Sequence, residues 1–481
     1  MSTSISSGII YTAISKYSNV FISLIVSAVL ARLISPDEFG IVAVVLVFVT
    51  FFNLLSDFGI GPAIIQNKEL DDNDIISIFS FSVLLGAFFS FVFLIGAPYI
   101  ANFYNNQALL NVTRWLSLSI LFFSLNVVPN SLLLKKLKFK QVGLIGTAVQ
   151  IVTGTIAIIL AHKGASYYAL VIKSILDGFL LFIACFYLNP IRITIRVNRG
   201  SIRKIARFSG YQFLFNFINY FSRNADSLLI GKYFGSSALG FYDRSYRLMM
   251  MPVQNLTHVI TPVLLPVLSG FQDDKKRIFK QYLKIVIFLS IIGFPLSIFL
   301  FFAAPEIIQI VYGSMWKNSI PIFKLLAITV GIQVVLSSSG SIFQVINRTD
   351  LLFKTGLLSS VFMVGGISYG VFYVKSLEGV AVGLIVAFII SFFQNFYVLI
   401  HIGLKSSFIA FLRGFLFSII ISIGMFIALQ FLTPLVGSTN VYYILLFKVI
   451  ISSLVFASII LGSAKYRKLL MDKIKLKRIQ R

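Results

Sequence analysis

Long apolar runs, separated by short polar segments, recur along the whole of this 481-residue sequence. A run of about 20 apolar residues is long enough to cross a lipid bilayer as a helix. The pattern therefore predicts an all-α integral membrane protein with about 14 transmembrane helices. The predicted spans lie near residues 9–33, 39–65, 76–103, 113–134, 142–162, 167–188, 207–234, 238–268, 281–303, 318–346, 352–374, 379–402, 407–431 and 441–464.

Charge is sparse and concentrated between the spans. The chain is 58% hydrophobic and only 12% charged, whereas an ordinary soluble protein is about a quarter charged. Its net charge of +25 would suit a nucleic-acid partner, but the basic residues cluster in the loops after even-numbered spans. Cytoplasmic loops carry this excess, so we expect a multi-pass protein with both termini in the cytoplasm and no nucleic-acid partner. The basic clusters fall at residues 135–140, 192–207, 275–280 and 465–481.

Several functions are excluded or disfavoured by what the chain lacks. No segment between spans approaches the roughly 50 residues of a small catalytic domain, and neither a P-loop nor an HExxH motif is present. Cys185 is the only cysteine, so an internal disulfide is impossible and a metal cluster is unsupported. The first residues lack a basic segment and a cleavage site, which predicts a retained first span. We expect neither an enzyme nor a cofactor.

The sequence contains a weak internal repeat with an offset near 200 residues. This offset aligns Gly40 with Gly240 and Pro62 with Pro262, and a slightly larger offset aligns APYI at 97–100 with APEI at 304–307. Parallel repeats of six spans are typical of transporters, although a two-bundle protein without transport activity would show the same repeat. The predicted parts are an N-terminal lobe at 1–190, a C-terminal lobe at 191–403, two additional helices at 404–464 and a basic tail at 465–481.

Polar residues in the seventh span recur at helical spacing. Gln212, Asn216, Asn219, Arg223 and Asp226 are 4, 3, 4 and 3 residues apart, which places them on one face of a helix. A charge at the centre of a span costs about 2.5–3.5 kcal/mol and usually faces water or a bundle interior. We therefore predict a stripe that lines a wet cavity and that pairs Arg223 with Asp226. Hydrogen bonding across a packed helix seam is the alternative.

Other polar side chains within spans extend this prediction. The first span carries polar residues at the equivalent positions, Lys16 and Asn19 among them, and the eighth span carries Arg244, Arg247 and His258. Arginine forks suit phosphate oxygens, so the mainly cationic set favours an anionic substrate. Further candidates are Asp57, Lys324 and the pair Lys173 and Asp177, which could form only an internal ion pair.

Five segments resemble motifs of a known family. They are ARLISPDEFG, LSDFGIGPAIIQNKE, LGFYDRSYRLMMMPVQ, VLLPVLSGFQDD and YGSMWKNSIPIFKLL. Together they resemble the polysaccharide transport family, the Wzx-like colanic-acid or teichuronic-acid type exporters of the multidrug/oligosaccharidyl-lipid/polysaccharide (MOP) superfamily. The resemblance implies two six-helix lobes around a V-shaped central cavity, as in MATE transporters, plus two C-terminal helices. It also implies flipping of undecaprenyl-pyrophosphate-linked oligosaccharides across the bacterial inner membrane by alternating access.

The expected function is therefore a lipid-linked oligosaccharide flippase that is monomeric and contacts membrane lipids, a polysaccharide polymerase and a chain-length regulator. A drug or cation antiporter of the same superfamily and a membrane polysaccharide polymerase remain alternatives. We expect Asp57 and Asp226 to couple an ion, and we expect no metal site. The predicted substrate-binding residues are Arg223, Asp226, Asn219, Asn216, Lys16, Asn19, Arg247 and Arg244.

Overall fold

The structure is a computed structural model in which every regular element of the described residues is a helix. The chain forms two compact units, Met1–Asp243 and Arg244–Arg481. The predicted lobe limits at 190 and 403 differ from this boundary and stay predictions. The described residues are 2–67, 69–192, 194, 198, 200–202, 220–221, 223–272, 274–438 and 440–463.

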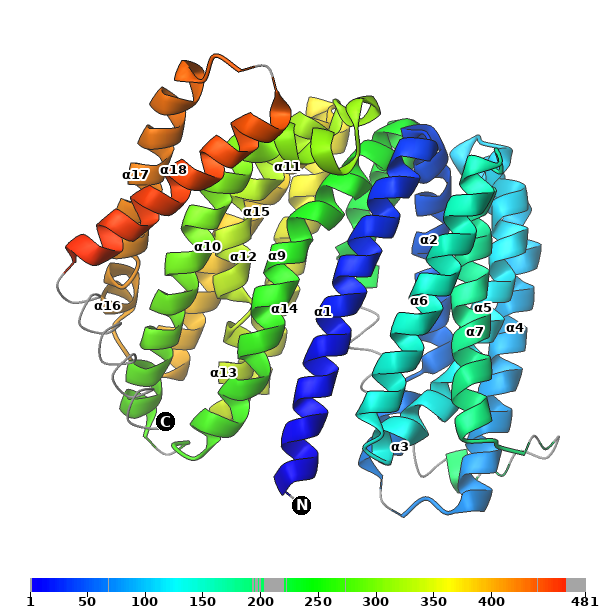
Figure 1. The fold of residues 1–481 in the computed structure, drawn as a ribbon. Helices are drawn as coiled ribbons and strands as arrows, with labels where there is room; N and C mark the ends of the chain where they lie inside the picture. The colour runs from blue at the N-terminus through cyan, green and yellow to red at the C-terminus, as the bar shows by residue number, and fades with distance from the viewer. Residues whose placement is uncertain are drawn as a thin grey trace. The chain divides into compact units, whose positions relative to one another are not determined.

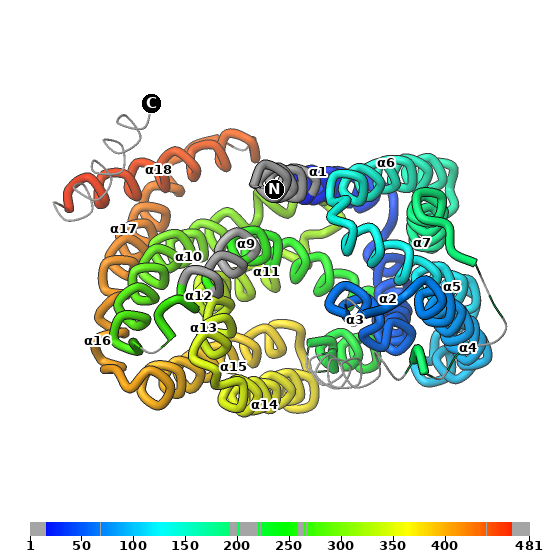
Figure 2. Tube along the Cα trace, turned by 90° about the horizontal axis from the view of Figure 1, so that it is seen from below, coloured from blue at the N-terminus to red at the C-terminus, as the bar shows by residue number. Residues whose placement is uncertain are grey.

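The first unit is a bundle of long helices (Figure 1). Within it α5 packs against α2, α4 and α7, and α1 packs against α6, as the end-on view in Figure 2 also shows. Residues 223–233 add a further helix. The elements are α1 (Ser2–Leu33), α2 (Pro36–Asp57), α3 (Ile60–Gln66), α4 (Asp72–Tyr104), α5 (Ala108–Lys135), α6 (Phe139–His162) and α7 (Tyr168–Leu188).

The second unit is arranged around α10, which packs against α11, α12, α17 and α18. The helix α9 begins in the first unit and continues into the second. Two segments, Tyr369–Val374 and Val398–Gly403, extend α14 and α15 as π-helix. The elements are α9 (Gly235–Ser269), α10 (Lys275–Val311), α11 (Ser319–Ile328), α12 (Val330–Leu336), α13 (Ser339–Val345), α14 (Thr349–Ser368), α15 (Leu377–Tyr397), α16 (Phe408–Arg413), α17 (Leu416–Leu432) and α18 (Val441–Gly462).

The described part of the chain contains 11 helices long and apolar enough to cross a membrane, or up to 12 with one bent pair. The predicted count of 14 is therefore not confirmed. The tenth predicted span is the bent pair, broken by 43° between α11 and the helix that follows it. The eighth lies in the long helix α9, which is not among the 11, and the side chains at 258–263 and 265–267 of this helix lie outside the described residues. Most of the seventh lies outside the described residues.

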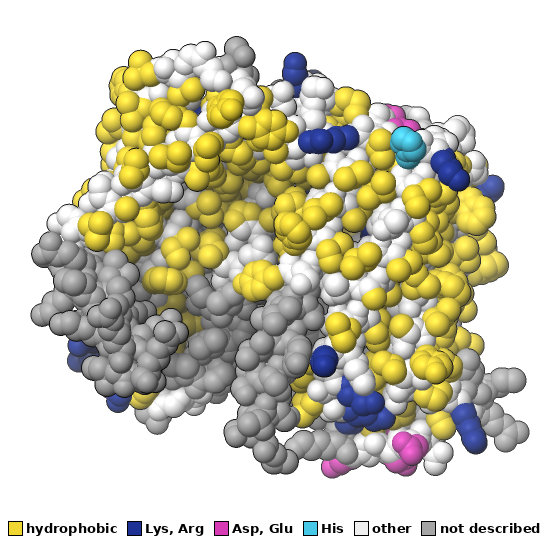
Figure 3. All heavy atoms as spheres, in the orientation of Figure 1, with side chains coloured by type: hydrophobic (Ala, Val, Ile, Leu, Met, Phe, Trp, Pro, Cys, Tyr) yellow, Lys and Arg dark blue, Asp and Glu magenta, His cyan; other side chains and the backbone are white. Residues whose placement is uncertain are grey.

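Large hydrophobic side chains are exposed along many of these helices. Figure 3 shows one face, where such side chains cover the helices and charged side chains lie mainly toward the ends. Tyr99 is 75% exposed, Phe431 69% and Phe21 64%. An exposed apolar surface of this extent is stable when lipid covers it. The chain is thus a multi-pass membrane protein, as predicted.

The second predicted span begins and breaks at residues of the resembling motifs. Ser35 caps α2 in a capping box with Glu38, and Pro36 occupies the first turn, where its missing N–H leaves no bond unmade. After Asp57 the backbone turns left-handed at Phe58 and Gly59, with φ of 42° and 73°. This turn ends α2 and starts the short helix α3. Hydropathy could not locate the break because apolar residues flank it.

The starts of α2 and α9 meet at two glycines that the repeat aligns. A methyl group added at Gly40 would overlap the carbonyl oxygen of Ser236, and one added at Gly240 would overlap the carbonyl oxygen of Pro36. Positions 36 and 40 correspond to 236 and 240 at the predicted offset of 200. The contact is therefore reciprocal between positions that the predicted offset aligns, and the duplication itself stays a prediction.

Candidate functional site

Asp226 and Arg223 lie in the same helix but in different surroundings. Asp226 is buried and accepts a hydrogen bond of 2.6 Å from the Tyr242 hydroxyl and one of 2.7 Å from the Ser227 amide. Arg223 is exposed. Among the described residues the two form no ion pair, which is a correction to the predicted pairing. Spacing alone could not reveal Tyr242 as a competing donor, since it belongs to the next helix.

The pairing of Asp226 with Tyr242 follows from a helix hairpin. The chain reverses between residues 223–233 and α9 at Gly235, where a φ of 86° permits the turn. Asp226 and Tyr242 are equally distant from Phe234 along the two arms, so the hairpin brings their side chains together. The carboxylate is thereby satisfied without Arg223. The guanidinium of Arg223 is left as an exposed cation with no described hydrogen bond or ion pair.

Lys16 and Asn19 are half-buried on α1, the helix that packs against α6. Asn19 Nδ2 lies 3.5 Å from the position that a Cβ of Gly146 would occupy, so this side chain faces the seam with α6. Asn19 Oδ1 is buried and accepts no hydrogen bond from any described residue. The structure therefore places Asn19 at a helix–helix contact. Lys16 lies one turn before it.

Asp57 lies at the break between α2 and α3. Its Oδ1 accepts a hydrogen bond of 3.3 Å from the Gly61 amide, and its side chain is half-buried. On the same stretch of α2, Asn53 Oδ1 and Ser56 Oγ are buried without a described hydrogen-bond partner. Buried polar atoms usually have partners. A carboxylate and orphaned oxygens near a helix break are thus compatible with a bound water or cation.

The remaining predicted residues lie in the second unit or outside the described residues. Arg244 is half-buried and its carbonyl accepts a 3.5 Å hydrogen bond from the Tyr312 hydroxyl, whereas Arg247 is exposed. The helix at His258 is described but its side chain is not. Asn216 and Asn219 lie outside the described residues.

Ion pairs are seen within membrane-length helices at two places in the described part of the chain. Lys173 and Asp177 are 2.7 Å apart on α7, and Thr153 donates a 2.5 Å hydrogen bond to the same carboxylate, so this candidate pair is an internal ion pair. The other, Lys448 of α18 with Glu306 of α10 at 2.8 Å, is more deeply buried. It was not predicted from the sequence, because Glu306 lies beyond the end of the predicted span at 281–303 and Lys448 lies 142 residues later in the chain.

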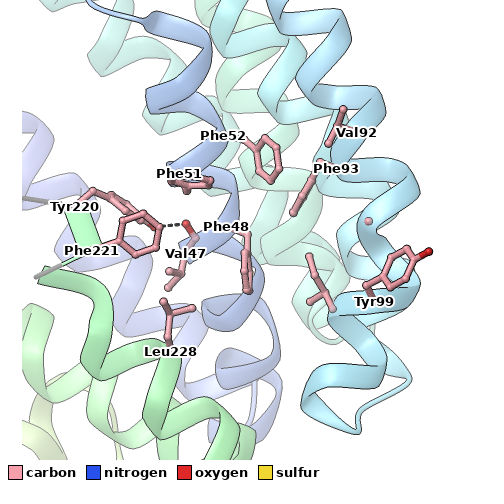
Figure 4. A pocket seen from close by; sticks show the side chains of 12 residues that line it. Val47, Phe48, Phe51, Phe52, Val92, Phe93, Tyr99, Tyr220, Phe221 and Leu228 are labelled. Carbon is pink, nitrogen blue, oxygen red and sulfur yellow. Dashed lines mark hydrogen bonds between the residues drawn. The ribbon is translucent and has the colours of Figure 1, made fainter. Parts of the chain in front are cut away.

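No described residues group three or more His, Cys, Asp or Glu side chains that could hold a metal ion. An aromatic groove, lined by α2, α4 and residues 220–228, was also missed. Tyr220 at its edge donates a hydrogen bond to the carbonyl of Val47 (Figure 4). The groove was not predicted because the lining residues of each span, considered separately, resemble ordinary lipid-facing residues.

Comparison with known proteins identifies the family of this chain. Residues 29–321 match the sequence profile of the family described as "Polysaccharide biosynthesis protein". The chain belongs to this family. The resemblance to polysaccharide transport proteins drawn from sequence motifs is thereby confirmed.

Curated proteins from three bacteria align with most of the chain. The lipopolysaccharide biosynthesis protein WzxC of Escherichia coli K12 is 27% identical over 84% of this chain and 82% of its own length. The teichuronic acid biosynthesis protein TuaB of Bacillus subtilis 168 is 24% identical over 76% of this chain and 75% of its own length. The succinoglycan biosynthesis transport protein ExoT of Rhizobium meliloti is 21% identical over 75% of this chain and 73% of its own length.

The fold of this family member recurs in two solved transporter structures. The inward closed lipid II flippase MurJ superposes with a TM-score of 0.76 at 16% identity, covering 96% of this chain and all of that one. An inward-facing MATE multidrug transporter of the MOP superfamily gives 0.62 at 16% identity, covering 80% of this chain and 97% of that one. The MOP-type, MATE-like fold is as predicted.

Proposed function

We propose that this chain flips undecaprenyl-pyrophosphate-linked oligosaccharide repeat units across the bacterial inner membrane by alternating access, for O-antigen, capsule or exopolysaccharide synthesis. The main support is its relationship, over 84% of its length, to a lipopolysaccharide biosynthesis protein. The fold is also that of a lipid II flippase. The proposed role is that of a transporter and not of an enzyme, as the names of the succinoglycan transport protein ExoT and the lipid II flippase MurJ suggest.

Arg223 is the residue that we propose to bind the pyrophosphate. It is exposed, and no described carboxylate neutralises it. Its planar fork can donate hydrogen bonds to two phosphate oxygens at once. Because Asp226 already receives hydrogen bonds from Tyr242 and Ser227, the substrate would meet Arg223 without displacing an internal partner. Lys16, Arg244 and the remaining predicted substrate-binding residues Asn19, Asn216, Asn219 and Arg247 stay proposals.

We propose Asp57 and Asp226 as the carboxylates that couple transport to an ion. Asp57 lies at a break in a membrane helix, a feature that transporters use to bind ions, and orphaned oxygens of Asn53 and Ser56 lie on the same stretch of α2. At Asp226 a cation or proton would compete with the hydroxyl of Tyr242. Which ion is coupled depends on ligand number and geometry that only the occupied state defines.

The proposed setting is the inner membrane, with both termini in the cytoplasm. Basic loops after even-numbered spans and a basic tail favour this orientation. A monomer that contacts a polysaccharide polymerase and a chain-length regulator would deliver each flipped unit directly to chain assembly.

Deletion of the gene tests the function. Loss of export with complete lipid-linked repeat units accumulating in the inner leaflet is the expected result, and re-expression of the chain should reverse it. Accumulation of single units already in the outer leaflet would instead indicate a polymerase. Unchanged polysaccharide with increased sensitivity to cationic drugs would indicate an antiporter.

A further inference from the structure

An aromatic groove of about 360 Å³ opens on the first unit. Figure 4 shows its walls, with Phe51 and Phe52 from α2 and Phe93 from α4. Phe52 and Phe93 have ring centroids 5.0 Å apart, and Phe51 lies 5.2 Å from Phe221 of the facing helix. These edge-on and tilted contacts fix the rings in place, so the groove is a preformed apolar surface.

The described residues leave this groove open. Tyr99 and Val92 at its rim are 75% and 39% exposed. Gly96 lies between them on α4, and a Cβ built there would meet no atom within 4 Å. A side chain larger than glycine would fit at this position without steric conflict, so the hollow is space that the fold does not need for its own packing.

One end of the groove carries a cation. Lys232 lies one helical turn beyond Leu228, and Phe103 lies one turn beyond Tyr99, so both residues continue the groove walls. Lys232 donates a hydrogen bond to the carbonyl of Phe103 and lies 4.6 Å from the centre of its ring. An ammonium has three donors, so Lys232 keeps donors for an anion at the mouth of an apolar groove.

We propose that this groove holds the isoprenoid tail of the lipid-linked substrate, with Lys232 binding the pyrophosphate. The inference rests on the proposed function and adds a second substrate contact to it. Arg223 and Lys232 are separated by nine positions, or about 13 Å along one helix. The two residues would therefore bind the pyrophosphate at different stages of the transport cycle. On the proposed orientation α4 and residues 223–233 both end at the outer surface, which assigns the groove to the flipped substrate before its release.

The chemistry of the groove favours an isoprenoid over a phospholipid chain. An isoprenoid is branched by a methyl group at every fourth carbon, and rigid rings set at an angle leave gaps that such branches fill. Close contact of this kind, summed over many atom pairs, discriminates by shape where bulk apolarity does not. The pyrophosphate attached to the isoprenoid tail places negative charge beside Lys232.

Photolabelling in proteoliposomes tests the groove. The probes are a diazirine-bearing polyprenyl pyrophosphate, the corresponding polyprenol and a diazirine-bearing phosphatidylglycerol. We expect the first probe to label residues 47–52, 92–100 and 220–228, and excess undecaprenyl pyrophosphate to compete. Gly96→Phe should reduce this labelling roughly tenfold, the effect of losing about two buried methylene groups of the tail. Gly365→Phe is the matched control, because Gly365 is also an open, lipid-facing helix glycine.

Lys232→Gln should weaken labelling by the pyrophosphate probe and leave labelling by the polyprenol unchanged. Lys163 is an exposed cation at another helix end of this unit. The control variant Lys163→Gln should therefore change labelling by neither probe. Should Gly96→Phe fail to fold, Val92→Trp fills the same opening from its rim. Equal labelling by phosphatidylglycerol without competition, or labelling that survives the filled groove, would overturn the inference. If the wild type still flips substrate when the groove test fails, the proposed function stands and only the groove inference is rejected. If the wild type does not flip substrate, the proposed function itself is rejected.

Discussion

Arg223 is an exposed cation in a membrane helix whose nearest acidic neighbour is already satisfied. If it binds pyrophosphate, Arg223→Ala should leave the amount of membrane-inserted protein near normal and lower export roughly ten- to hundredfold, since a hydrogen bond to a charged group contributes about 1.5–3 kcal/mol. Arg223→Lys should rescue only partly because lysine cannot offer a bidentate fork. Polysaccharide export and the amount of the protein in the membrane should be measured for each variant. A loss of export that merely follows a loss of protein contradicts a role of Arg223 in binding pyrophosphate.

The site was only partly predictable from residue spacing. Residues 223 and 226 are less than one helical turn apart and lie on the same face of the helix. Their spacing therefore placed both residues in the predicted polar stripe. What spacing could not supply was the hairpin at Gly235, which carries Tyr242 to Asp226 from 16 residues away and separates the carboxylate from Arg223. Likewise, the environment of Asn19 depends on α6, more than 100 residues later in the chain.

At the scale of elements, one ion pair ties α18 to α10. Lys448 donates to Glu306 and also to the carbonyl of Phe302, both at 2.8 Å. Removing one partner of a buried pair costs about 3–5 kcal/mol because it leaves an uncompensated charge, while apolar replacement of both is often neutral. Lys448→Met and Glu306→Met should each lower thermal stability in detergent, and the double variant should recover most of it. Additive losses in the double variant would contradict this coupling.

The meeting of α2 and α9 yields a second expectation at this scale. A methyl group at Gly40 or Gly240 has no room, because backbone carbonyls of the other helix occupy the space. Gly40→Ala and Gly240→Ala should each destabilise the protein by about 1–3 kcal/mol, as overpacking does, and should impair export similarly because the contacts are reciprocal. The control Gly365→Ala, with open space around it, should be neutral in the same thermal-shift assay. Equal stability of all three variants would mean that this contact is not close.

Hydropathy predicted most elements because length and apolarity alone decide whether a helix can span a bilayer. The predicted spans 76–103 and 142–162, for example, coincide with α4 and α6 within a few residues. Breaks within spans were not predicted, because the backbone turn at Gly59 and the 43° bend after α11 leave hydropathy unchanged. The long helix α9 contains the predicted span 238–268, but the side chains at 258–263 and 265–267 lie outside the described residues, so this span stays a prediction.

For the whole molecule, the distribution of basic residues predicts its orientation. A reporter enzyme that is active only outside the cytoplasm should be silent when fused after Arg481 and active when fused after Lys163 or Lys375, in loops that are expected to face outward. The same fusions to a reporter that matures only in the cytoplasm should give the opposite pattern. An active C-terminal fusion would mean that the chain crosses the membrane an odd number of times.

The membrane potential should act on the transport cycle as a whole. Moving an anionic headgroup outward from a negative interior is favourable by about 2.3 kcal/mol per charge per 100 mV. The same potential also favours the return of the empty, cationic site toward the negative interior. We propose that this return is nevertheless the slow half-cycle, which an ion bound at Asp57 or Asp226 would assist. In proteoliposomes, an imposed potential of this sign should accelerate flipping, and Asp57→Asn or Asp226→Asn should abolish its response to an ion gradient while leaving its response to potential. Transport indifferent to both the membrane potential and the ion gradient would reject this cycle.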